Sequence, residues 1–190
     1  MKIENENAEQ LQKALQAATS RAVEALVDIL GCDINLELNQ IHFLEQEHLK
    51  EFITDTFGET GTVIQIRFSG GLDGSANLLF PGNNKNAMLE ILAKQDPDLI
   101  SNTAAQTSVI IEVANIVLNM FTGTILNQMG VNVVYEIPNL ISDNSNINVL
   151  IESGNASSGK QKIHILTSHL SICGQEVAFY IFVKFNSLYN

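Results

Sequence analysis

Apolar residues recur at helical spacing in two long segments of the chain. From Ala8 to Leu30 they fall three or four positions apart, and from Thr103 to Met129 nearly every position outside one narrow stripe is apolar. Gly31 and Gly130 follow these segments, and glycine is the usual residue at the C-terminal end of a helix. The pattern therefore predicts two long helices, the second buried over most of its circumference.

Segments with strand-like patterns surround the two helices. Asp33–Leu38 alternates polar and apolar residues, as a half-buried strand does. The glycines of Gly70–Gly74 permit the positive φ angles of a tight turn, so this segment predicts a hairpin between two strands. The other predicted strands are Thr62–Ser69, Ser75–Phe80, Asn132–Ile137, Asn148–Glu152, Lys162–Ser168 and Glu176–Lys184. A short helix is predicted over Asn86–Lys94 and a loop with a helical turn over His42–Phe57. Ser142–Asn146 and Ser153–Gly159 are predicted to be connections.

The two halves of the chain repeat the same order of elements. A shift of 99 residues aligns residues 25–34 with 124–133, and in each case a helix ends at glycine and leads directly into a strand. The hairpins near Gly70–Gly74 and Ser171–Gly174 correspond in the same way. We expect an α+β fold built from a duplicated helix–strand–hairpin unit, with two long helices packed on one largely antiparallel sheet. Residues 1–190 would form one domain whose halves cover about 8–95 and 103–185.

Composition narrows the classes of partner. The chain has 190 residues, 45% of them hydrophobic, which is enough for a real core. Its net charge is -11 with only 10 Lys and Arg, so nucleic acid and anionic membranes would be repelled. Residues 1–10 are polar and acidic, and no segment approaches 18 consecutive apolar residues. We therefore expect a cytoplasmic protein whose partner is another protein.

The usual residues of self-contained hydrolases are absent from the sequence. Cys32 and Cys173 are isolated, which predicts two ordinary thiols rather than a metal site or a disulfide framework. The four histidines show no metal spacing with each other or with cysteine, and no Gly-x-Ser-x-Gly motif occurs. We expect no metal and no cofactor of the chain's own.

A narrow polar stripe runs along the second long helix. Ser108, Glu112, Asn115, Asn119 and Thr122 fall within an arc of about 80° at 100° per residue. By periodicity alone the stripe would be the solvated edge of an amphipathic helix. Solvated edges usually carry Lys, Arg and Glu, whereas this one carries a single carboxylate and carboxamides one turn apart. Such groups are suited to orienting a ligand.

The residues Ser108-x3-Glu112-x2-Asn115-x22-Pro138 resemble the motif of the CheC-type phosphatases of bacterial chemotaxis. The resemblance covers about Gln10–Phe185. It implies dephosphorylation of CheY or a similar response regulator, in which Asn115 aligns a water on the aspartyl phosphate and Glu112 pairs with the partner's active-site lysine. The Mg²⁺ would belong to the partner. Ser108 at the helix edge and Pro138 at the strand exit would shape the binding surface beside Asn119.

The first half departs from this motif. The shift of 99 residues places Lys13 where Glu112 stands and Gln16 where Asn115 stands, with Glu9 and Asn39 at the other two positions. Lys13 reverses the charge of the docking carboxylate, so we expect a non-catalytic copy, with a weakened second site as the alternative. In having a single intact motif, the chain resembles the CheX phosphatases, and this resemblance implies a possible homodimer. The short connection from Pro138 to Asn148 also favours this comparison.

Two further hypotheses stand beside the phosphatase. The chain could be a non-catalytic module that binds a receiver domain, the receptor deamidase CheD or the flagellar switch through the same face. It could also be a soluble α+β domain with a coincidental motif. The intact Glu112–Asn115 pair favours the enzyme, although Asn119 stands where relatives often have a small residue and its bulk could crowd the docking face.

Overall fold

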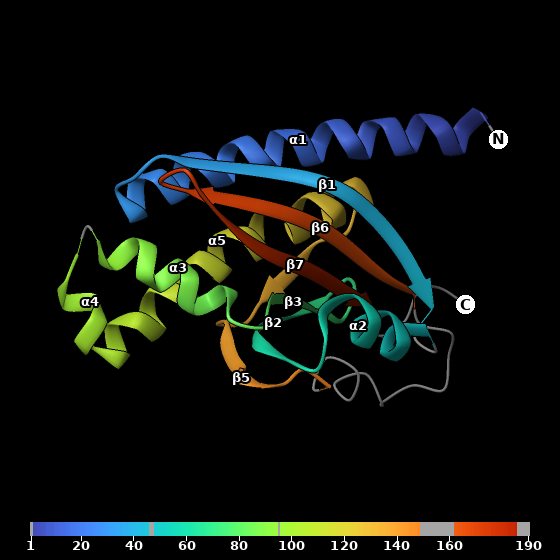
Figure 1. Ribbon diagram of the computed structural model, residues 1–190. Coiled ribbons are helices and arrows are strands. Elements are labelled where there is room, and N and C mark those ends of the chain that lie inside the picture. The colour runs from blue at the N-terminus through green and yellow to red at the C-terminus, as the bar shows by residue number, and fades with distance from the viewer. Residues whose placement is uncertain (1, 46–47, 95, 149–161, 186–190) are drawn as a thin grey trace.

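The computed structural model describes residues 2–45, 48–94, 96–148 and 162–185 (Figure 1). The described strands form one antiparallel sheet in the order β1-β6-β7-β3-β2-β4, and β5 also pairs with β2. The predicted α+β fold is therefore confirmed. The elements are α1 (Lys2–Leu30), β1 (Ile34–Glu45), α2 (Leu49–Phe57), β2 (Thr60–Gly70), β3 (Gly74–Pro81), α3 (Asn84–Ala93), α4 (Asp98–Ser101), α5 (Thr103–Gln128), β4 (Val133–Tyr135), β5 (Asn139–Asn146), β6 (Lys162–Ile172) and β7 (Gln175–Phe185).

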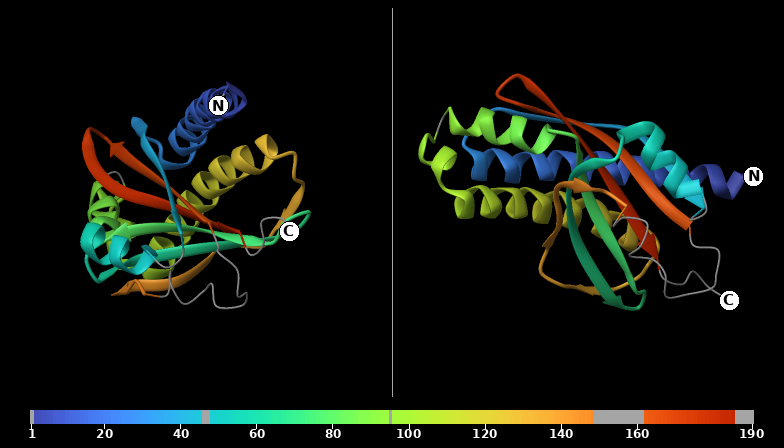
Figure 2. Two further views of the ribbon diagram at one scale, coloured as in Figure 1. Left: turned by 90° about the vertical axis from the view of Figure 1, so that its right-hand side faces the viewer. Right: turned by 60° about the horizontal axis from the view of Figure 1, so that its bottom comes forward.

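The two long helices lie side by side and antiparallel on one face of the sheet (Figure 2). Their ends follow the sequence signals. The Asn102 side chain accepts a hydrogen bond from Ala105 N at 3.0 Å and so caps the start of α5. Gly31 and Gly130 adopt φ angles of +65° and +68° at the ends of α1 and α5, a conformation that favours glycine.

The main core lies between α1, α5 and the sheet. The buried residues of α1 are Leu15, Ala18, Ala22 and Leu26, at the predicted helical spacing. The two alanines lack bulk, which allows the backbone of α1 to approach its neighbours closely. Among the described residues, α5 is the one helix long and apolar enough to cross a membrane. Most of that apolar length is buried inside the domain, so α5 is a core helix.

A second, smaller core lies on the opposite face of the sheet. Here α2 packs Leu49, Ile53 and Phe57 against the strands, and the ring of Phe57 meets that of Phe182 edge-on at 5.8 Å. Each such side chain contributes about 1.5–3 kcal/mol when it leaves water. The sheet is thus covered by the long helices on one face and by α2 on the other.

The strand order shows the duplication directly. Taken by position in the two halves, β1, β2 and β3 correspond to β4 with β5, β6 and β7, and the order across the sheet reads alike from either edge. The first strand of each half pairs with the hairpin of the other half. The correspondence extends to an irregularity: β1 shifts register between Leu38 and Gln40, and the equivalent strand is interrupted at Pro138, between β4 and β5.

Several predicted boundaries were wrong. The segment predicted as a loop with a helical turn contains the end of β1 and the helix α2, and the connection predicted over Ser142–Asn146 is part of strand β5. Strand β5 is mostly exposed, so its residues are polar although its backbone pairs with β2. Periodicity cannot reveal a strand that buries little. The predictions over Asn148–Glu152 and Ser153–Gly159 lie almost wholly outside the described residues.

Candidate functional site

The polar stripe of α5 changes exposure along its length. Ser108 and Glu112 are exposed, Asn115 and Asn119 are half-buried, and Thr122 is fully buried. The stripe is therefore open to solvent where the motif residues lie and passes beneath other elements towards the end of α5. The side chains of Glu112 and Asn115 lie at the surface of the domain, not in its core.

Asn115 is held by its neighbour one turn further along the helix. The Asn119 Nδ2 group donates a hydrogen bond to Asn115 Oδ1 at 2.7 Å. This bond restricts the rotation of the Asn115 carboxamide. A carbonyl oxygen has two lone pairs, so Asn115 Oδ1 can accept a second hydrogen bond, and its Nδ2 group can donate. The Asn115 carboxamide is thus oriented while keeping both functions for a ligand.

Glu112 has no competing partner in the part of the chain that the structure describes. Among the described residues, none forms an ion pair or a hydrogen bond with its carboxylate. The neighbouring Ser108 uses its hydroxyl within the helix, where Oγ donates to the Ala104 carbonyl at 2.9 Å. Ser108 thus contributes to the helix surface but offers its proton to the backbone. Glu112 is the one charged group of the motif and remains available to a cation from outside.

The segment after α5 packs beside the same helix. Pro138 is buried, whereas Val134 and Ile137 are 73% and 81% exposed. A Cβ atom added at Gly123 of α5 would lie 3.6 Å from the Tyr135 hydroxyl, so this side chain lies close against the helix. Pro138 lies between β4 and β5, and the side chains of Val134 in β4 and Ile137 after it point outward. They are candidates for contact with a partner protein.

Three polar atoms near the buried end of the stripe lack hydrogen-bond partners. They are Asn119 Oδ1, Thr122 Oγ1 and the Tyr135 hydroxyl. Burial raises the pKa of the Tyr135 phenol, so this group stays protonated. These atoms lie beneath the surface, and none of them is positioned to contact a macromolecular partner directly. Sequence spacing places Thr122 on the polar stripe, but Thr122 is fully buried and so is not part of the exposed surface.

The corresponding positions of the first half lie on α1. Lys13 and Gln16 are both exposed. The side chains of Glu9 and Asn39 lie outside the described part of the chain. Because the carboxylate and the shorter carboxamide are both replaced, the first half presents a different chemistry at the equivalent place.

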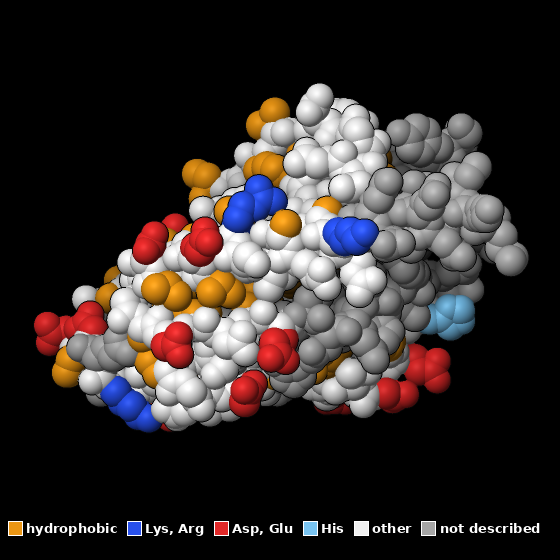
Figure 3. Space-filling model, turned by 90° about the horizontal axis from the view of Figure 1, so that it is seen from above, with side chains coloured by type: hydrophobic (Ala, Val, Ile, Leu, Met, Phe, Trp, Pro, Cys, Tyr) orange, Lys and Arg blue, Asp and Glu red, His pale blue; other side chains and the backbone are white. Residues whose placement is uncertain are grey.

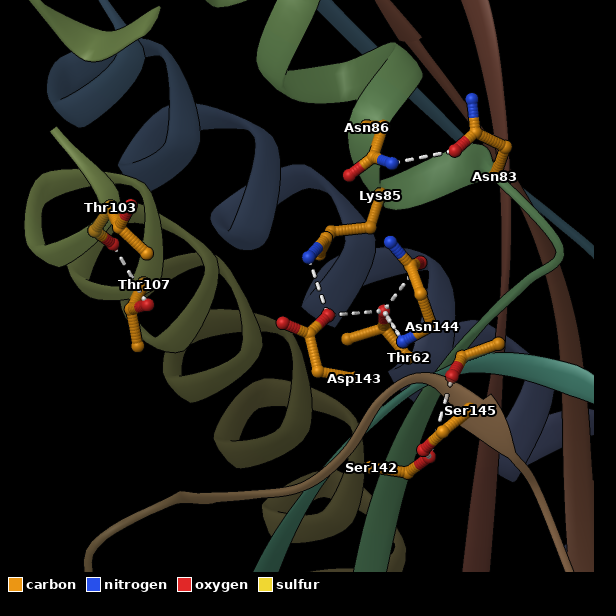
Figure 4. Close-up of polar contacts among 11 residues, drawn as sticks. Thr62, Asn83, Lys85, Asn86, Thr103, Thr107, Ser142, Asp143, Asn144 and Ser145 are labelled. Carbon is orange, nitrogen blue, oxygen red and sulfur yellow. Dashed lines mark hydrogen bonds and ion pairs between the residues drawn. The ribbon is translucent and has the colours of Figure 1, made fainter. Parts of the chain in front are cut away.

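A polar cluster that the sequence did not predict fixes β5 near the start of α5 (Figure 4). Lys85 of α3 forms an ion pair with Asp143 of β5. The Thr62 hydroxyl donates to Asp143 Oδ1 at 3.1 Å, and Asn144 N donates to Thr62 Oγ1 at 3.2 Å. These residues are 58 to 82 positions apart in sequence, so no local pattern could reveal the cluster. It anchors the strand that follows Pro138.

The described hollows lie away from the motif. One small cavity is lined by residues of α3, α5 and β5 around Lys85 and Asp143, and a more open hollow lies between α3, α4 and the start of α5. Glu112 and Asn115 line neither. On the face seen in Figure 3, acidic side chains are dispersed with a few basic ones among them. No group of three or more His, Cys, Asp or Glu residues in the described part could hold a metal ion.

Comparison with known proteins places the fold in a defined class. No family model and no curated protein matches the sequence. Solved structures do match, and they include chemotaxis proteins CheX and the proteins FliY and FliM. The chain therefore has a CheC/CheX-like fold, as the motif led us to expect.

Three of these structures illustrate the likeness. FliM in its complex with FliG from H. pylori has a TM-score of 0.62 and 8% identity, and the match covers 94% of this chain and 93% of that one. FliY from Thermotoga maritima has a TM-score of 0.57 and 16% identity, with coverages of 88% and 84%. CheX from Vibrio vulnificus has a TM-score of 0.51 and 15% identity, with coverages of 91% and 99%.

Proposed function

We propose that this chain is a phosphatase for the aspartyl phosphate of a response-regulator receiver domain in the cytoplasm. The observation that supports it is the presentation of Glu112 and Asn115 at the surface of an otherwise buried helix, one turn apart, with the Asn115 carboxamide held by Asn119. The surface lies outside the described hollows, which suits a phosphate that belongs to another protein. The CheC/CheX-like fold is the second support.

The reaction asks little of the enzyme. A water oxygen attacks the phosphorus in line, the bond from phosphorus to the aspartate oxygen breaks, and inorganic phosphate and a free aspartate carboxylate result. The proton of the water passes to a phosphate oxygen. The leaving carboxylate has an ordinary pKa near ~4, so it needs no acid to protonate it. Placement of the water and electrostatic stabilisation of the phosphoryl group together supply most of the acceleration in such reactions.

Each motif residue has a distinct part in this proposal. Asn115 accepts a hydrogen bond from the water at Oδ1 and holds it on the phosphorus without protonating it. Glu112 forms an ion pair with a lysine of the receiver domain, and this contact sets the orientation of the two proteins. The metal that neutralises the phosphate would be the Mg²⁺ of the receiver domain. Val134 and Ile137 would add apolar contact at the edge of the interface.

The test follows the loss of phosphate from a phosphorylated receiver domain in the presence of Mg²⁺. We expect the wild type to accelerate this loss and Asn115→Ala to abolish the acceleration while still binding the phosphorylated domain. Glu112→Ala should weaken binding, seen as a raised KM. Gln16→Ala, at the equivalent place on α1, is the matched control and should leave the rate unchanged.

A binding module is the second candidate. FliM, whose fold is similar, is seen in complex with FliG, so this fold can serve in protein assembly. In that case the chain would bind a receiver domain, CheD or a component of the flagellar switch and leave any phosphate intact. If the wild type accelerates phosphate loss from none of the receiver domains of its own organism, the phosphatase proposal is wrong and the binding module takes its place.

A further inference from the structure

A polar cluster, buried except at Arg67, lies on the α2 face of the sheet, opposite to α5. Three strands contribute to it in register: Arg67 on β2 pairs with Ser75 on β3, and Ser75 pairs with Lys184 on β7. In the adjacent row Gln65 pairs with Asn77, which pairs with Phe182. Paired side chains on one face lie about 5 Å apart at Cβ. The cluster therefore continues the row of strand residues beyond the small apolar core under α2.

The orientation of the amides in this cluster is fixed by Arg67. A guanidinium can only donate, and Arg67 Nε donates to Gln65 Oε1 at 3.1 Å. Gln65 must then turn its Nε2 group to Asn77, where it donates to Oδ1 at 2.9 Å. Asn77 consequently turns its own Nδ2 group away from Gln65. Reversing either amide would set two donors against each other, so the chain of hydrogen bonds has one direction.

This series of hydrogen bonds ends at a donor group that has no acceptor. Asn77 is fully buried, and its Nδ2 group has no hydrogen-bond partner. Lys184, diagonal to Asn77 in the pairing, is 1% exposed, and its Nζ also has no partner. Burial of a polar donor without an acceptor is costly, and burial of an ammonium group is more so. Two buried donors at diagonal positions on one face of the sheet therefore call for an acceptor.

The described residues supply no such acceptor. None of the acidic side chains among them contacts Lys184, although the whole chain carries 21 Asp and Glu residues. A water molecule could accept from both donors but would not balance the ammonium charge. An anion with at least two acceptor oxygens satisfies Asn77 Nδ2 and Lys184 Nζ together and also balances that charge. The exposed guanidinium of Arg67 lies at the edge of the same cluster, where it would attract an approaching anion.

We infer that Lys184, Asn77 and Arg67 form a binding site for a small oxyanion, of the carboxylate or phosphate class. The oxygens of the anion accept from Lys184 Nζ and Asn77 Nδ2, and Ser75 lies between Lys184 and Arg67. The site is on the face of the sheet opposite to Glu112 and Asn115, so its occupancy does not depend on the phosphatase proposal.

The experiment measures the melting temperature of the full chain against increasing sodium acetate and, separately, sodium phosphate, with sodium chloride holding ionic strength constant. We expect a saturable rise of about 3 °C or more in the wild type, as for any ligand that binds only the folded state. The anion that gives the larger rise identifies the class of ligand. Isothermal titration with that anion should give one site per chain.

Three variants make the test specific. Lys184→Met keeps the shape of the side chain without its charge and should remove the response. Asn77→Asp places a carboxylate oxygen where Nδ2 now lies, so it should remove the response while raising the melting temperature in chloride alone. Lys94→Met removes a charge from the exposed end of α3 and is the matched control, with the wild-type response retained. An absent response in the wild type, or an equal one in all four proteins, would overturn the inference.

Discussion

At the scale of single residues, the candidate site depends on a bond that the motif does not contain. Asn119 lies outside the Glu–Asn spacing, and its bulk was expected to crowd a docking partner. It is half-buried instead and donates to Asn115 Oδ1. In the proposed phosphatase Asn119 would be a positioning residue, because it would act on the phosphate only through the orientation of Asn115.

Asn119→Leu tests this role, since leucine keeps the size of the side chain but cannot donate. We expect kcat for phosphate loss to fall about tenfold, equivalent to one ordinary hydrogen bond, while KM stays within about twofold. The steady-state kinetics of the variant on a phosphorylated receiver domain would show the split between the two constants. A raised KM with unchanged kcat would instead assign Asn119 to the docking surface.

Lys184 gives a second prediction at this scale. Burial lowers the pKa of its ammonium group to about 8, against 10.5 for an ordinary lysine. Between these values the unfolded chain binds more protons than the folded one, so the free energy of unfolding rises with pH. Below pH 8 the folded state carries the full cost of the buried charge, and above 10.5 it carries none.

Between pH 8 and 10.5, the free energy of unfolding of the wild type should therefore rise by on the order of 3 kcal/mol more than that of Lys184→Met. Urea denaturation of both proteins in chloride buffers measures the difference, and groups shared by the two proteins cancel. Saturation with the anion proposed above should reduce the gain, because a bound negative charge raises the pKa of Lys184. An equal pH dependence of the two proteins would mean that folding does not lower the pKa of Lys184.

At the scale of elements, the space around two glycines differs between a strand and a helix. A Cβ at Gly74, where β3 begins, would lie 2.3 Å from the Lys184 carbonyl oxygen and 2.5 Å from the ring of Phe68. The backbone of β7 cannot move away without breaking the sheet. At Gly123 inside α5 the nearest atom would be the Tyr135 hydroxyl at 3.6 Å, which is ordinary contact.

The same substitution should consequently have opposite effects at the two sites. Gly74→Ala should lower the free energy of unfolding by about 3 kcal/mol through overpacking. Gly123→Ala should raise it by about 0.5–1 kcal/mol, because alanine is the better helix former and no strained contact is made. Chemical denaturation of both variants provides the comparison. If Gly123→Ala were as damaging as Gly74→Ala, Tyr135 would have to pack closer to Gly123 than the 3.6 Å described above, and the prediction would be wrong.

The elements that the sequence predicted correctly are those that bury a large face. The periodicity of α1 and α5, their glycine ends and the two long hairpins were all legible, because each follows from a local pattern of burial or turn chemistry. Strand β5 and the helix α2 were missed. In β5 the polar residues reflect an exposed strand, and in α2 only three positions in nine are buried.

The candidate site was predictable only in part. The positions of Glu112 and Asn115 on one face of α5 follow from the geometry of a helix, as does their nearness to Asn119. The burial of Thr122 does not, because it depends on tertiary packing around the second half of α5. The row of Arg67, Ser75 and Lys184 could not be predicted either, because it depends on the register of three strands from both halves of the chain.

At the scale of the whole molecule, the duplicated halves are not two bodies placed next to each other. They share the main core and one sheet, and one copy of the motif position carries Glu and Asn while the other carries Lys and Gln. Such a division lets one half keep a surface for chemistry while the other half changes its surface without loss of the fold. The two faces of the sheet are separated in the same way, with the candidate phosphatase surface on one side and the Lys184 cluster on the other.

The exchange of first strands between the halves has a consequence for the integrity of the protein. Strand β1 completes the hairpin of β6 and β7, while β4 and β5 complete the hairpin of β2 and β3. After a break in the backbone between α3 and α4, each fragment would still supply a strand to the hairpin of the other fragment. Either fragment alone would expose an unfilled sheet edge and an uncovered apolar face, so the pieces should survive only as a pair.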